Sequence, residues 1–485
     1  MTGRDVYISG RWQTGEGAAF SSICPATGET VWAGHAASGA QVNAALASAR
    51  AAGADWALRP QANRTHILEL YGKALARRTD EIARTIARDM GKALWDAQGE
   101  ANAMVGKIAL SIAAQVDRAG TKRMDAVFGS IHLMHRPHGV MAVFGPFNFP
   151  GHLPNGHIVP ALLAGNTCVF KPSELAPAVA EIMIDAFEEA GLPEGCLNVV
   201  HGARETGGAL LEGEIDGLLF TGSAKTGCHF HKYFGGRPEV MLALEMGGNN
   251  PLIIWDPADV DAAADIAAQS AFLTTGQRCS CARRVILPEG PWGDSVVEGI
   301  LARAQGLKVG AWDDEGIFMG PLVSAQAAKA AIDFQAMLEA KGGRILTPAV
   351  QADEGLGFVT AGVVDVTDAS NIPDEELFGP VMQIYRVPDF PSAITQANDT
   401  KYGLSGGLVC DDDYGWVQAS EQMRAGILNR NRPTAGASGT MPFGGPGLSG
   451  NHRPSAWYAA DYCAWPQASQ VADTAQRLSA QGFPK

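Results

Sequence analysis

In Val140-Met141-Ala142-Val143-Phe144-Gly145-Pro146-Phe147-Asn148-Phe149-Pro150, an apolar run that predicts a strand is followed by a loop of glycine, proline and aromatic residues. Further short apolar runs follow, at 167–170, 197–200, 218–220 and 241–244. Residues 176–190 carry apolar side chains at helical spacing and end at Gly191. Strands that alternate with helices predict a doubly wound α/β fold on a parallel sheet, with ligands at the carboxyl ends of the strands.

A second α/β block is expected from about residue 251 to residue 439. It opens with the run Leu252-Ile253-Ile254, which predicts a strand, and continues with a predicted helix over residues 259–275. Single hydrophobic cores seldom grow beyond about 250 to 300 residues. The chain of 485 residues is therefore expected to form two or three domains.

Composition excludes several classes of protein. Hydrophobic residues at 46% and charged residues at 18% are typical of an ordinary globular protein. The net charge of −14 repels nucleic acid and anionic lipid, and no apolar stretch approaches the length of a membrane span. The start of the chain has no apolar signal core, and eight scattered cysteines do not suggest a disulfide framework. We therefore expect a cytoplasmic protein with neither nucleic acid nor membrane as a partner.

Two segments suggest a cysteine nucleophile with a carboxylate base: Gly276-Gln277-Arg278-Cys279-Ser280-Cys281 and Leu244-Glu245-Met246-Gly247-Gly248-Asn249. A thiolate attacks a carbonyl carbon, and a glutamate can later activate the water that hydrolyses the thioester. Cys279 and Cys281 could also suggest a metal site or a redox pair. No second pair of soft ligands stands at zinc spacing, so we expect no metal.

Two glycine-rich segments compete as candidate phosphate-binding turns. Residues 218–227 predict a strand, a tight turn and a helix start, where backbone N–H groups can approach a pyrophosphate. The spacing of Gly222 and Gly227 differs from the usual dinucleotide fingerprint. Residues 445–450 match that fingerprint, but no strand precedes them and no acidic residue follows at the required distance. We interpret the second match as accidental.

The order of these segments resembles the NAD(P)-dependent aldehyde dehydrogenase superfamily over almost the whole chain. Further segments carry the resemblance: Phe170-Lys171-Pro172-Ser173-Glu174, Phe220-Thr221-Gly222-Ser223, Glu375-Glu376-Leu377-Phe378-Gly379-Pro380 and Pro442-Phe443-Gly444-Gly445. The resemblance implies an aldehyde dehydrogenase-like fold with a Rossmann-type NAD domain over 1–120 and 138–250 and an α/β catalytic domain over 251–440. It also implies a β-flap for oligomerisation with a tail, over 121–137 and 441–485, in a homodimer or homotetramer.

The resemblance also implies roles for individual residues. Cys279 is expected to be the nucleophile and Glu245 the base, while Asn148 and the backbone N–H of Cys279 would stabilise the oxyanion. The residues expected to bind the cofactor are Pro146, Lys171, Glu174, Gly222, Ser223, Ala224, Lys225, Thr226, Gly227, Glu376 and Phe378. A carboxylate at Glu174 would repel the 2′-phosphate of NADP, so we expect NAD as the cofactor.

Three segments narrow the resemblance to one subgroup of the superfamily. Residues 135–139, 149–157 and 444–466 are typical of enzymes that oxidise a semialdehyde bearing two carboxylates during arginine breakdown. In a chain of charge −14, such a substrate needs nearby cations, and Arg278 and Arg453 are our candidates. The sequence leaves three alternatives open: an enzyme for another acidic semialdehyde such as that of succinate or glutamate, an enzyme that uses CoA in place of water, and a catalytically silent relative.

Overall fold

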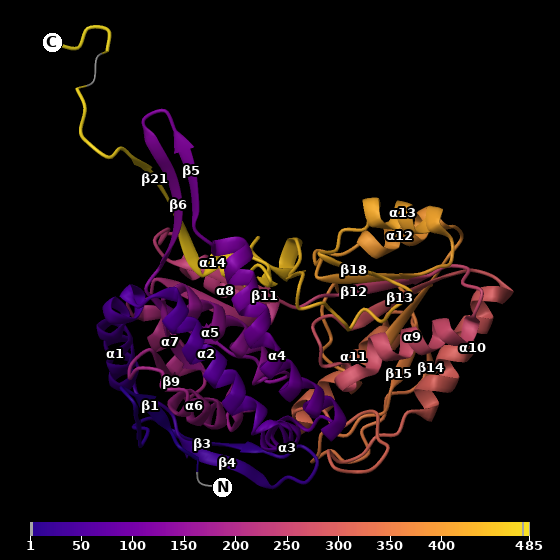
Figure 1. Cartoon of the computed structure of the whole chain (residues 1–485). Helices are drawn as coiled ribbons and strands as arrows, with labels where there is room; N and C mark the ends of the chain where they lie inside the picture. The colour runs from indigo at the N-terminus through magenta and orange to yellow at the C-terminus, as the bar shows by residue number, and fades with distance from the viewer. Residues whose placement is uncertain (1–2, 478–479, 485) are drawn as a thin grey trace.

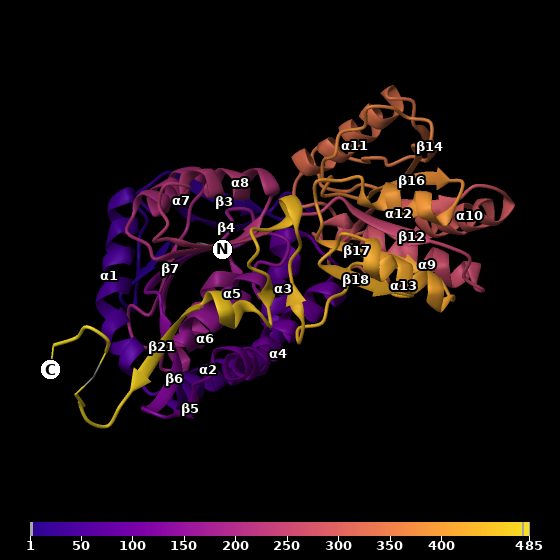
Figure 2. The same cartoon turned by 90° about the horizontal axis from the view of Figure 1, so that it is seen from above.

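The computed structural model describes residues 3–477 and 480–484 of the chain. Figure 1 shows two α/β lobes side by side, with a small β-structure projecting from one of them. Each lobe contains one seven-stranded sheet. The predicted α/β class is confirmed, and Figure 2 shows that the second lobe is formed by the later part of the chain.

The sheet of the first lobe has the predicted strands at its centre. Its order is β11 (Met241–Met246), β10 (Gly217–Gly222), β7 (Val140–Phe144), β8 (Thr167–Lys171), β9 (Leu197–Val200), β1 (Val6–Ile8) and β2 (Arg11–Gln13). The five strands from β11 to β9 are parallel, whereas β1 is antiparallel to both of its neighbours. The start of the chain therefore completes a sheet whose centre lies more than a hundred residues further on.

Both faces of this sheet are covered by helices, which explains why its strands are apolar throughout. In β7, Val140, Ala142 and Phe144 pack on one side, and Met141 and Val143 pack on the other. The helices of the first side are α1 (Gly39–Leu58), α7 (Arg204–Glu212) and α8 (Ala224–Tyr233). Those of the second side are α2 (Gln61–Ala76), α3 (Thr79–Met90), α4 (Leu94–Ala119), α5 (His152–Ala164) and α6 (Val179–Glu189). Burial on both faces is characteristic of a doubly wound parallel sheet.

The sheet of the second lobe follows the same principle. Its order is β14 (Arg344–Thr347), β15 (Gly362–Asp365), β16 (Val381–Val387), β13 (Ala282–Pro288), β12 (Asn250–Ile254), β17 (Ser405–Val409) and β18 (Ile427–Arg430), parallel except at β14. Leu252 and Ile254 pack on one side and Ile253 on the other. The helices of this lobe are α9 (Val260–Phe272), α10 (Pro291–Gly306), α11 (Ala325–Ala340), α12 (Phe390–Asn398) and α13 (Asp413–Gln422).

Two predicted helices differ from the structure at their ends. The helix expected over 176–190 begins later, since α6 starts at Val179. The helix expected over 259–275 has Asp259 as its N-cap and ends at Phe272, where a 3₁₀ turn over Leu273–Gly276 replaces the last α-helical turn. Because Thr274 and Thr275 adopt left-handed backbone angles there, the α-helix cannot continue.

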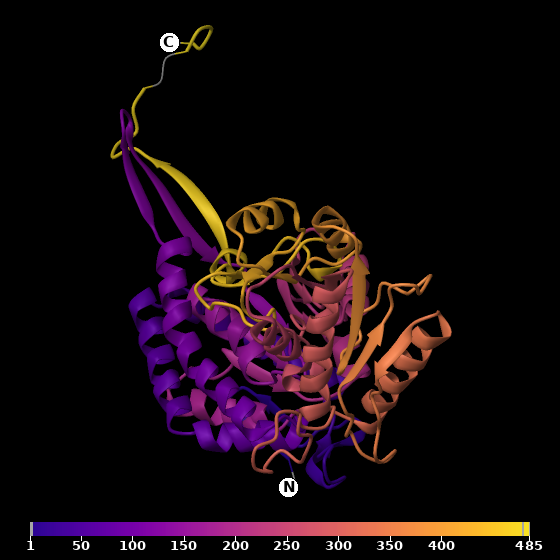
Figure 3. The same ribbon diagram turned by 90° about the vertical axis from the view of Figure 1, so that its right-hand side faces the viewer.

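The projecting structure is a three-stranded antiparallel sheet of β5 (Lys122–Ala126), β6 (Gly129–Pro137) and β21 (Ala464–Val471). Figure 3 shows that it stands clear of both lobes. Within the described part of the predicted tail, β21 alone pairs with β6, whereas residues 442–462 return to the first lobe. This returning segment contains β19 (Pro442–Phe443), β20 (Ser455–Ala456) and α14 (Ala459–Tyr462).

The other strands, β3 (Ala19–Ile23) and β4 (Thr30–His35), form a hairpin near the start of the chain. None of the helices in the described ranges is both long and apolar enough to span a membrane. All eight cysteines are unpaired in the structure.

Candidate active site

Two cavities meet at the residues predicted to carry the chemistry. The larger cavity has a volume of about 570 Å³ and the smaller one about 390 Å³. Both are lined by Cys279 and Glu245, together with Leu153, Thr221 and Phe443. Glu245 lies on β11 of the first lobe, and Cys279 precedes β13 of the second lobe. The two predicted catalytic side chains are therefore brought together between the lobes.

The loop that carries Cys279 has an unusual backbone. Thr274 and Thr275 both have positive φ angles, 54° and 57°, which are rare for β-branched residues. Gly276 follows with φ 73°, and a Cβ there would lie 2.2 Å from the carbonyl oxygen of Gly379. The tight approach to this neighbouring segment allows only glycine at position 276.

Side chains hold the carbonyl groups of this loop in fixed directions. Arg283 donates to Gly276 O at 2.6 Å and to Arg278 O at 2.9 Å. Asn250 donates to Cys279 O at 2.7 Å and to Cys281 O at 2.9 Å. With these peptide groups fixed, the orientation of the Cys279 backbone N–H is fixed too.

Asn148 contacts the same loop from the first lobe. It is buried, and its amide nitrogen donates to Gln277 O at 2.9 Å. The segment that follows Asn148 is held by Glu100, whose Oε1 accepts the backbone N–H groups of Gly151 and His152, each at 3.0 Å. Asn148 is thus held against the loop that carries Cys279.

Glu245 is only 4% exposed, and its Oε2 has no hydrogen-bond partner in the described part of the chain. Burial raises the pKa of this carboxyl well above its usual value, and a hydrogen bond from the Ser455 backbone acts in the opposite direction. A carboxyl with a raised pKa is a better proton acceptor once it is ionised. This environment suits a general base.

Cys279 and Cys281 have different surroundings. Burial raises the pKa of the Cys279 thiol, the carboxylates of Glu376 and Glu245 add to the effect, and Arg283 opposes it. Cys281 is fully buried, and its Sγ donates to Leu273 O at 3.6 Å. Of the two, Cys279 lines both cavities and Cys281 lines neither, so the Cys279 thiol is the one that a bound molecule could reach.

The smaller cavity collects most of the residues predicted to bind the cofactor. Those that line it are Pro146, Lys171, Glu174, Gly222, Ser223, Thr226, Glu376 and Phe378. Ala224, Lys225 and Gly227 are not among its lining residues. Gly227 instead packs under Met246, whose sulfur would lie 2.2 Å from a Cβ at that position.

The turn from β10 into α8 has the predicted strand–turn–helix form. Ser223 caps α8, and its hydroxyl accepts the backbone N–H of Thr226 at 3.2 Å. Lys171 Nζ donates to Gly202 O at 2.7 Å and lies 3.4 Å from Glu174 Oε2. Lys171, Glu174, Ser223 and Thr226 all line the smaller cavity. Glu376 and Phe378 line it as well.

The glycines at 445–450 serve packing. A Cβ at Gly445 would lie 2.0 Å from Gly403 O, and one at Gly447 would lie 2.1 Å from Lys401 O. Residues 445–450 line neither cavity. The fingerprint match therefore reflects close backbone packing, as its sequence context indicates.

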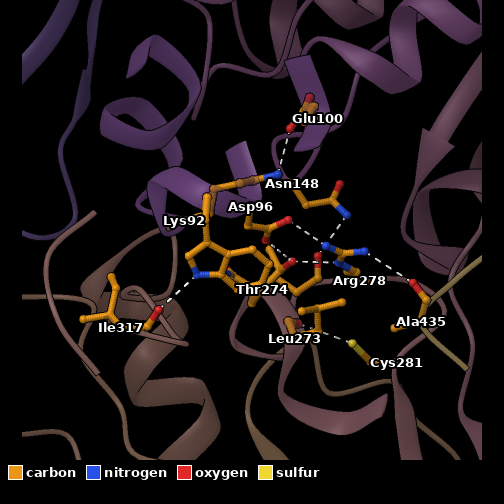
Figure 4. Close-up of polar contacts among 12 residues, drawn as sticks. Lys92, Asp96, Glu100, Asn148, Leu273, Thr274, Arg278, Cys281, Ile317 and Ala435 are labelled. Atoms are coloured by element: carbon orange, nitrogen blue, oxygen red, sulfur yellow. Dashed lines mark hydrogen bonds and ion pairs between the residues drawn. The ribbon is translucent and has the colours of Figure 1, made fainter. Parts of the chain in front are cut away.

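The two arginines predicted to anchor the substrate are placed differently. Arg278 lines the larger cavity, but it is already paired with Asp96 at 2.7 Å, as Figure 4 shows. It also donates to Thr274 Oγ1 at 2.7 Å and to Ala435 O at 3.3 Å. Arg453 is exposed and lines neither cavity. Arg278 therefore lies at the wall of the larger cavity with a carboxylate partner already in place, and Arg453 lies at neither cavity.

Several positioning residues were missed from the sequence. The pair Arg283 and Arg284 interrupts an apolar strand, and this unusual pattern could have indicated buried arginines. Asn250 and the fully buried Lys92–Glu100 ion pair, 2.7 Å between Nζ and Oε2, left no comparable signal. A lysine and a glutamate are ordinarily surface residues.

Comparison with curated proteins identifies close relatives. The chain is 52% identical over 467 residues to N-succinylglutamate 5-semialdehyde dehydrogenase of Burkholderia multivorans, which covers 96% of each protein. It is also 52% identical over 477 residues to N-succinylglutamate 5-semialdehyde dehydrogenase 2 of Caulobacter vibrioides, which covers 97% of each. The subgroup suggested by the sequence motifs is thereby confirmed.

Solved structures show the same fold. The Mycobacterium tuberculosis aldehyde dehydrogenase complexed with NAD+ matches with a TM-score of 0.90 and 28% identity, covering 98% of this chain and 99% of that one. Aldehyde dehydrogenase 21 of Physcomitrella patens, in complex with the reaction product succinate, matches with a TM-score of 0.88 and 26% identity, covering 97% and 98%. The model of the aldehyde dehydrogenase family matches residues 12–467, and the chain belongs to that family.

Proposed function

We propose that this enzyme oxidises N-succinylglutamate 5-semialdehyde to N-succinylglutamate with NAD, in the breakdown of arginine. The observation that carries the proposal is the meeting of Cys279 and Glu245 at the junction of the two cavities. Near-full-length relatives that bear the name of this dehydrogenase support the choice of substrate. The larger cavity would hold the aldehyde and the smaller one the cofactor.

The first chemical step needs a thiolate. Because burial raises the pKa of Cys279, the resting thiol is protonated at neutral pH and gives its proton to water in the cavity before it attacks. The Cys279 sulfur then bonds to the aldehyde carbon and forms a thiohemiacetal, whose oxygen is stabilised by the Cys279 N–H and the Asn148 amide. Arg283 holds Arg278 O, which belongs to the same peptide group as the Cys279 N–H, so that N–H stays in place without reorganisation during the reaction.

The remaining steps convert the thiohemiacetal into the acid. NAD, held in the smaller cavity by residues such as Lys171 and Glu376, would supply the hydride acceptor for the thiohemiacetal carbon, and Cys279 would then carry a thioester. Glu245 takes a proton from water, the resulting hydroxide attacks the thioester carbon, and the acid departs as the thiol group is restored. The buried, unpartnered Oε2 of Glu245 is suited to accept this proton.

The preference for NAD rests on the smaller cavity. Glu376 Oε1 is buried without a hydrogen-bond partner among the described residues, and Arg283 lies 3.6 Å away. The capped N-terminus of α8 and the Lys171–Glu174 pair supply further polar groups. These features fit a dinucleotide, and the Glu174 carboxylate would repel an added 2′-phosphate. We therefore favour NAD over NADP.

Purified enzyme supplied with N-succinylglutamate 5-semialdehyde should reduce NAD faster than NADP, without any need for CoA. Succinate and glutamate semialdehydes, tested in parallel, should give lower kcat/KM. Higher kcat/KM on either of these would show that another acidic semialdehyde is the substrate. A strict need for CoA would show that the acyl group passes to CoA rather than to water. No NADH from any aldehyde would identify a catalytically silent protein.

A further inference from the structure

We propose that Lys107 of α4, together with His152 of α5, binds a carboxylate of the substrate in the larger cavity and so determines specificity for acidic semialdehydes. The inference rests on the proposed function, because it concerns the part of the substrate remote from the aldehyde. Neither residue was a predicted site residue.

Lys107 lies on the side of α4 that lines the larger cavity. The cavity wall formed by this helix contains Gly99, Ala103 and Gly106, whose small side chains leave room beside Lys107. The Lys107 side chain is 6% exposed, and its Nζ would lie 3.9 Å from a Cβ at Gly156 of α5. The ammonium group therefore lies between α4 and α5, beside a cavity that also reaches Cys279.

Lys107 differs from the other buried cations of this region in having no counterion. Lys92 is paired with Glu100, and Arg278 is paired with Asp96. The Lys107 side chain makes neither a hydrogen bond nor an ion pair with any residue in the described ranges, 3–477 and 480–484. Because a buried charge is strongly unfavourable unless it is paired, this ammonium provides a site for an incoming anion.

His152 adds a second group to this site. It lines the same cavity, and its buried Nδ1 has no hydrogen-bond partner in the described structure. Burial lowers the pKa of His152 to about 3, and Lys107 and Lys92 contribute to the shift. The imidazole is thus neutral at physiological pH. His157 differs, because its two ring nitrogens already contact Tyr462 Oη at 2.9 Å and Thr221 Oγ1 at 3.1 Å.

A carboxylate is the ligand that best matches these groups. It accepts charge-assisted hydrogen bonds from an ammonium group and supplies the missing counterion. N-Succinylglutamate 5-semialdehyde carries two carboxylates, one on the α-carbon and one at the end of the succinyl group. A neutral aliphatic aldehyde has neither and would gain nothing from Lys107.

The test compares Lys107→Met and Lys107→Gln with the matched control Lys73→Met, a lysine exposed on the neighbouring helix α2. NADH formation is measured with N-succinylglutamate 5-semialdehyde, N-acetylglutamate 5-semialdehyde and hexanal. Loss of one charge-assisted hydrogen bond should lower kcat/KM for the dianion by about ten- to a hundredfold. Hexanal kinetics should be unchanged in both Lys107 variants, and Lys73→Met should match the wild type on every substrate.

The N-acetyl substrate locates the contact, because it retains the α-carboxylate and lacks the succinyl one. A loss on both acylated substrates assigns Lys107 to the α-carboxylate, and a loss on the succinyl substrate alone assigns it to the distal one. Equal losses on hexanal and the dianion, or no loss on the dianion, would overturn the inference.

A binding measurement tests the carboxylate site at Lys107 independently of which semialdehyde is the substrate. Calorimetry with N-succinylglutamate and with succinate should show weaker binding to both Lys107 variants than to the wild type. If the wild type prefers succinate semialdehyde, the proposed substrate is wrong, yet the Lys107 variants should still lose activity on that monoanion. Unchanged binding of both acids to the variants would reject the carboxylate site itself.

Discussion

Cys279 and Cys281 are two residues apart, but the structure predicts opposite results when each is replaced. Cys279→Ala should abolish aldehyde oxidation and leave NAD binding nearly unchanged, because the thiol forms the covalent bond and only lines the cofactor cavity. Cys281→Ala should stay active, since its buried sulfur makes one weak contact with Leu273 O. Steady-state NADH formation and NAD titration check both variants. An active Cys279→Ala enzyme would show that the nucleophile is misassigned.

Glu245→Gln should separate the two halves of the reaction. The amide cannot accept a proton from water, so hydride transfer should proceed and the thioester should accumulate. Pre-steady-state traces should then show a burst of NADH of about one equivalent per active site, followed by turnover slowed by about 10² to 10⁴. The absence of a burst, with a slow first turnover, would place Glu245 in the activation of the thiol.

The Lys107 site predicts that KM for the dianionic semialdehyde rises with pH. Burial lowers the pKa of Lys107 to about 8, so the free enzyme has the cationic form below that pH and loses it above. KM for the dianionic semialdehyde should therefore rise as pH increases through about 8, while KM for hexanal stays level. The other titratable groups lining this cavity are Asp96, Glu100, His152, His157, Glu245, Arg278 and Cys279.

Lys107→Met separates Lys107 from these other groups, since it removes only the lysine. The variant should show a high KM for the dianion at every pH, without the rise near pH 8. A rise of the same size in the variant would assign the titration to another group.

At the scale of elements, the loop between α9 and β13 is held in place by side chains from several other segments. Asn250 of β12 donates to the carbonyls of Cys279 and Cys281 and accepts the Ser405 backbone N–H at 3.0 Å. Asn250→Ala leaves these buried groups unpaired, at a cost of about 1–3 kcal/mol for each. We expect a lower Tm and a lower kcat with all substrates, including hexanal.

Asn198→Ala is a matched control for Asn250→Ala. Asn198 is a buried asparagine of β9, far along the chain from the loop, and it also bonds only backbone groups, Ser9 N and Gly195 O. It should lower Tm while leaving kcat of the folded enzyme near the wild-type value. Equal kcat in the two variants would mean that Asn250 contributes to stability alone.

The elements also show what the sequence can and cannot predict. The buried strands were predictable because residues such as Val140 to Phe144 are apolar on both faces. This pattern is typical of a parallel sheet with helices on both sides. The end of α9 was not, because the left-handed Thr274 and Thr275 are held by contacts with distant residues such as Gly320. The net charge of the residues that line the larger cavity likewise depends on which cations are paired with a carboxylate. Arg278 is paired with Asp96, and the Lys107 side chain has no carboxylate partner among the described residues. Spacing along the chain could predict neither the pairing of Arg278 nor the lack of a partner for Lys107.

At the scale of the whole molecule, the site exists because two α/β lobes meet. Glu245, the proposed base, and Asn148 belong to the first lobe, and Cys279, the proposed nucleophile, belongs to the second with Glu376 and Phe378. The returning segment 442–462 adds Phe443, Ser455 and Ala456 to the wall of the larger cavity. A change in how the lobes pack would therefore disturb both reactant and cofactor positions together.

The projecting sheet leads to a prediction about assembly. The hairpin between β5 and β6 exposes Val127 and Phe128, β5 exposes Met124, and β21 exposes Trp465. Such a group of apolar side chains on a sheet that stands clear of the body is typical of a protein interface (Figure 3). We expect a homodimer or homotetramer in which this sheet contacts another copy.

Val127→Asp combined with Phe128→Asp should shift the wild-type oligomer toward smaller species in light scattering coupled to gel filtration. Val350→Asp, which also adds a charge at an exposed apolar residue but in the other lobe, should leave the mass unchanged. A double variant with the mass of the wild type would place the interface on another surface, and a monomeric wild type would reject oligomerisation altogether.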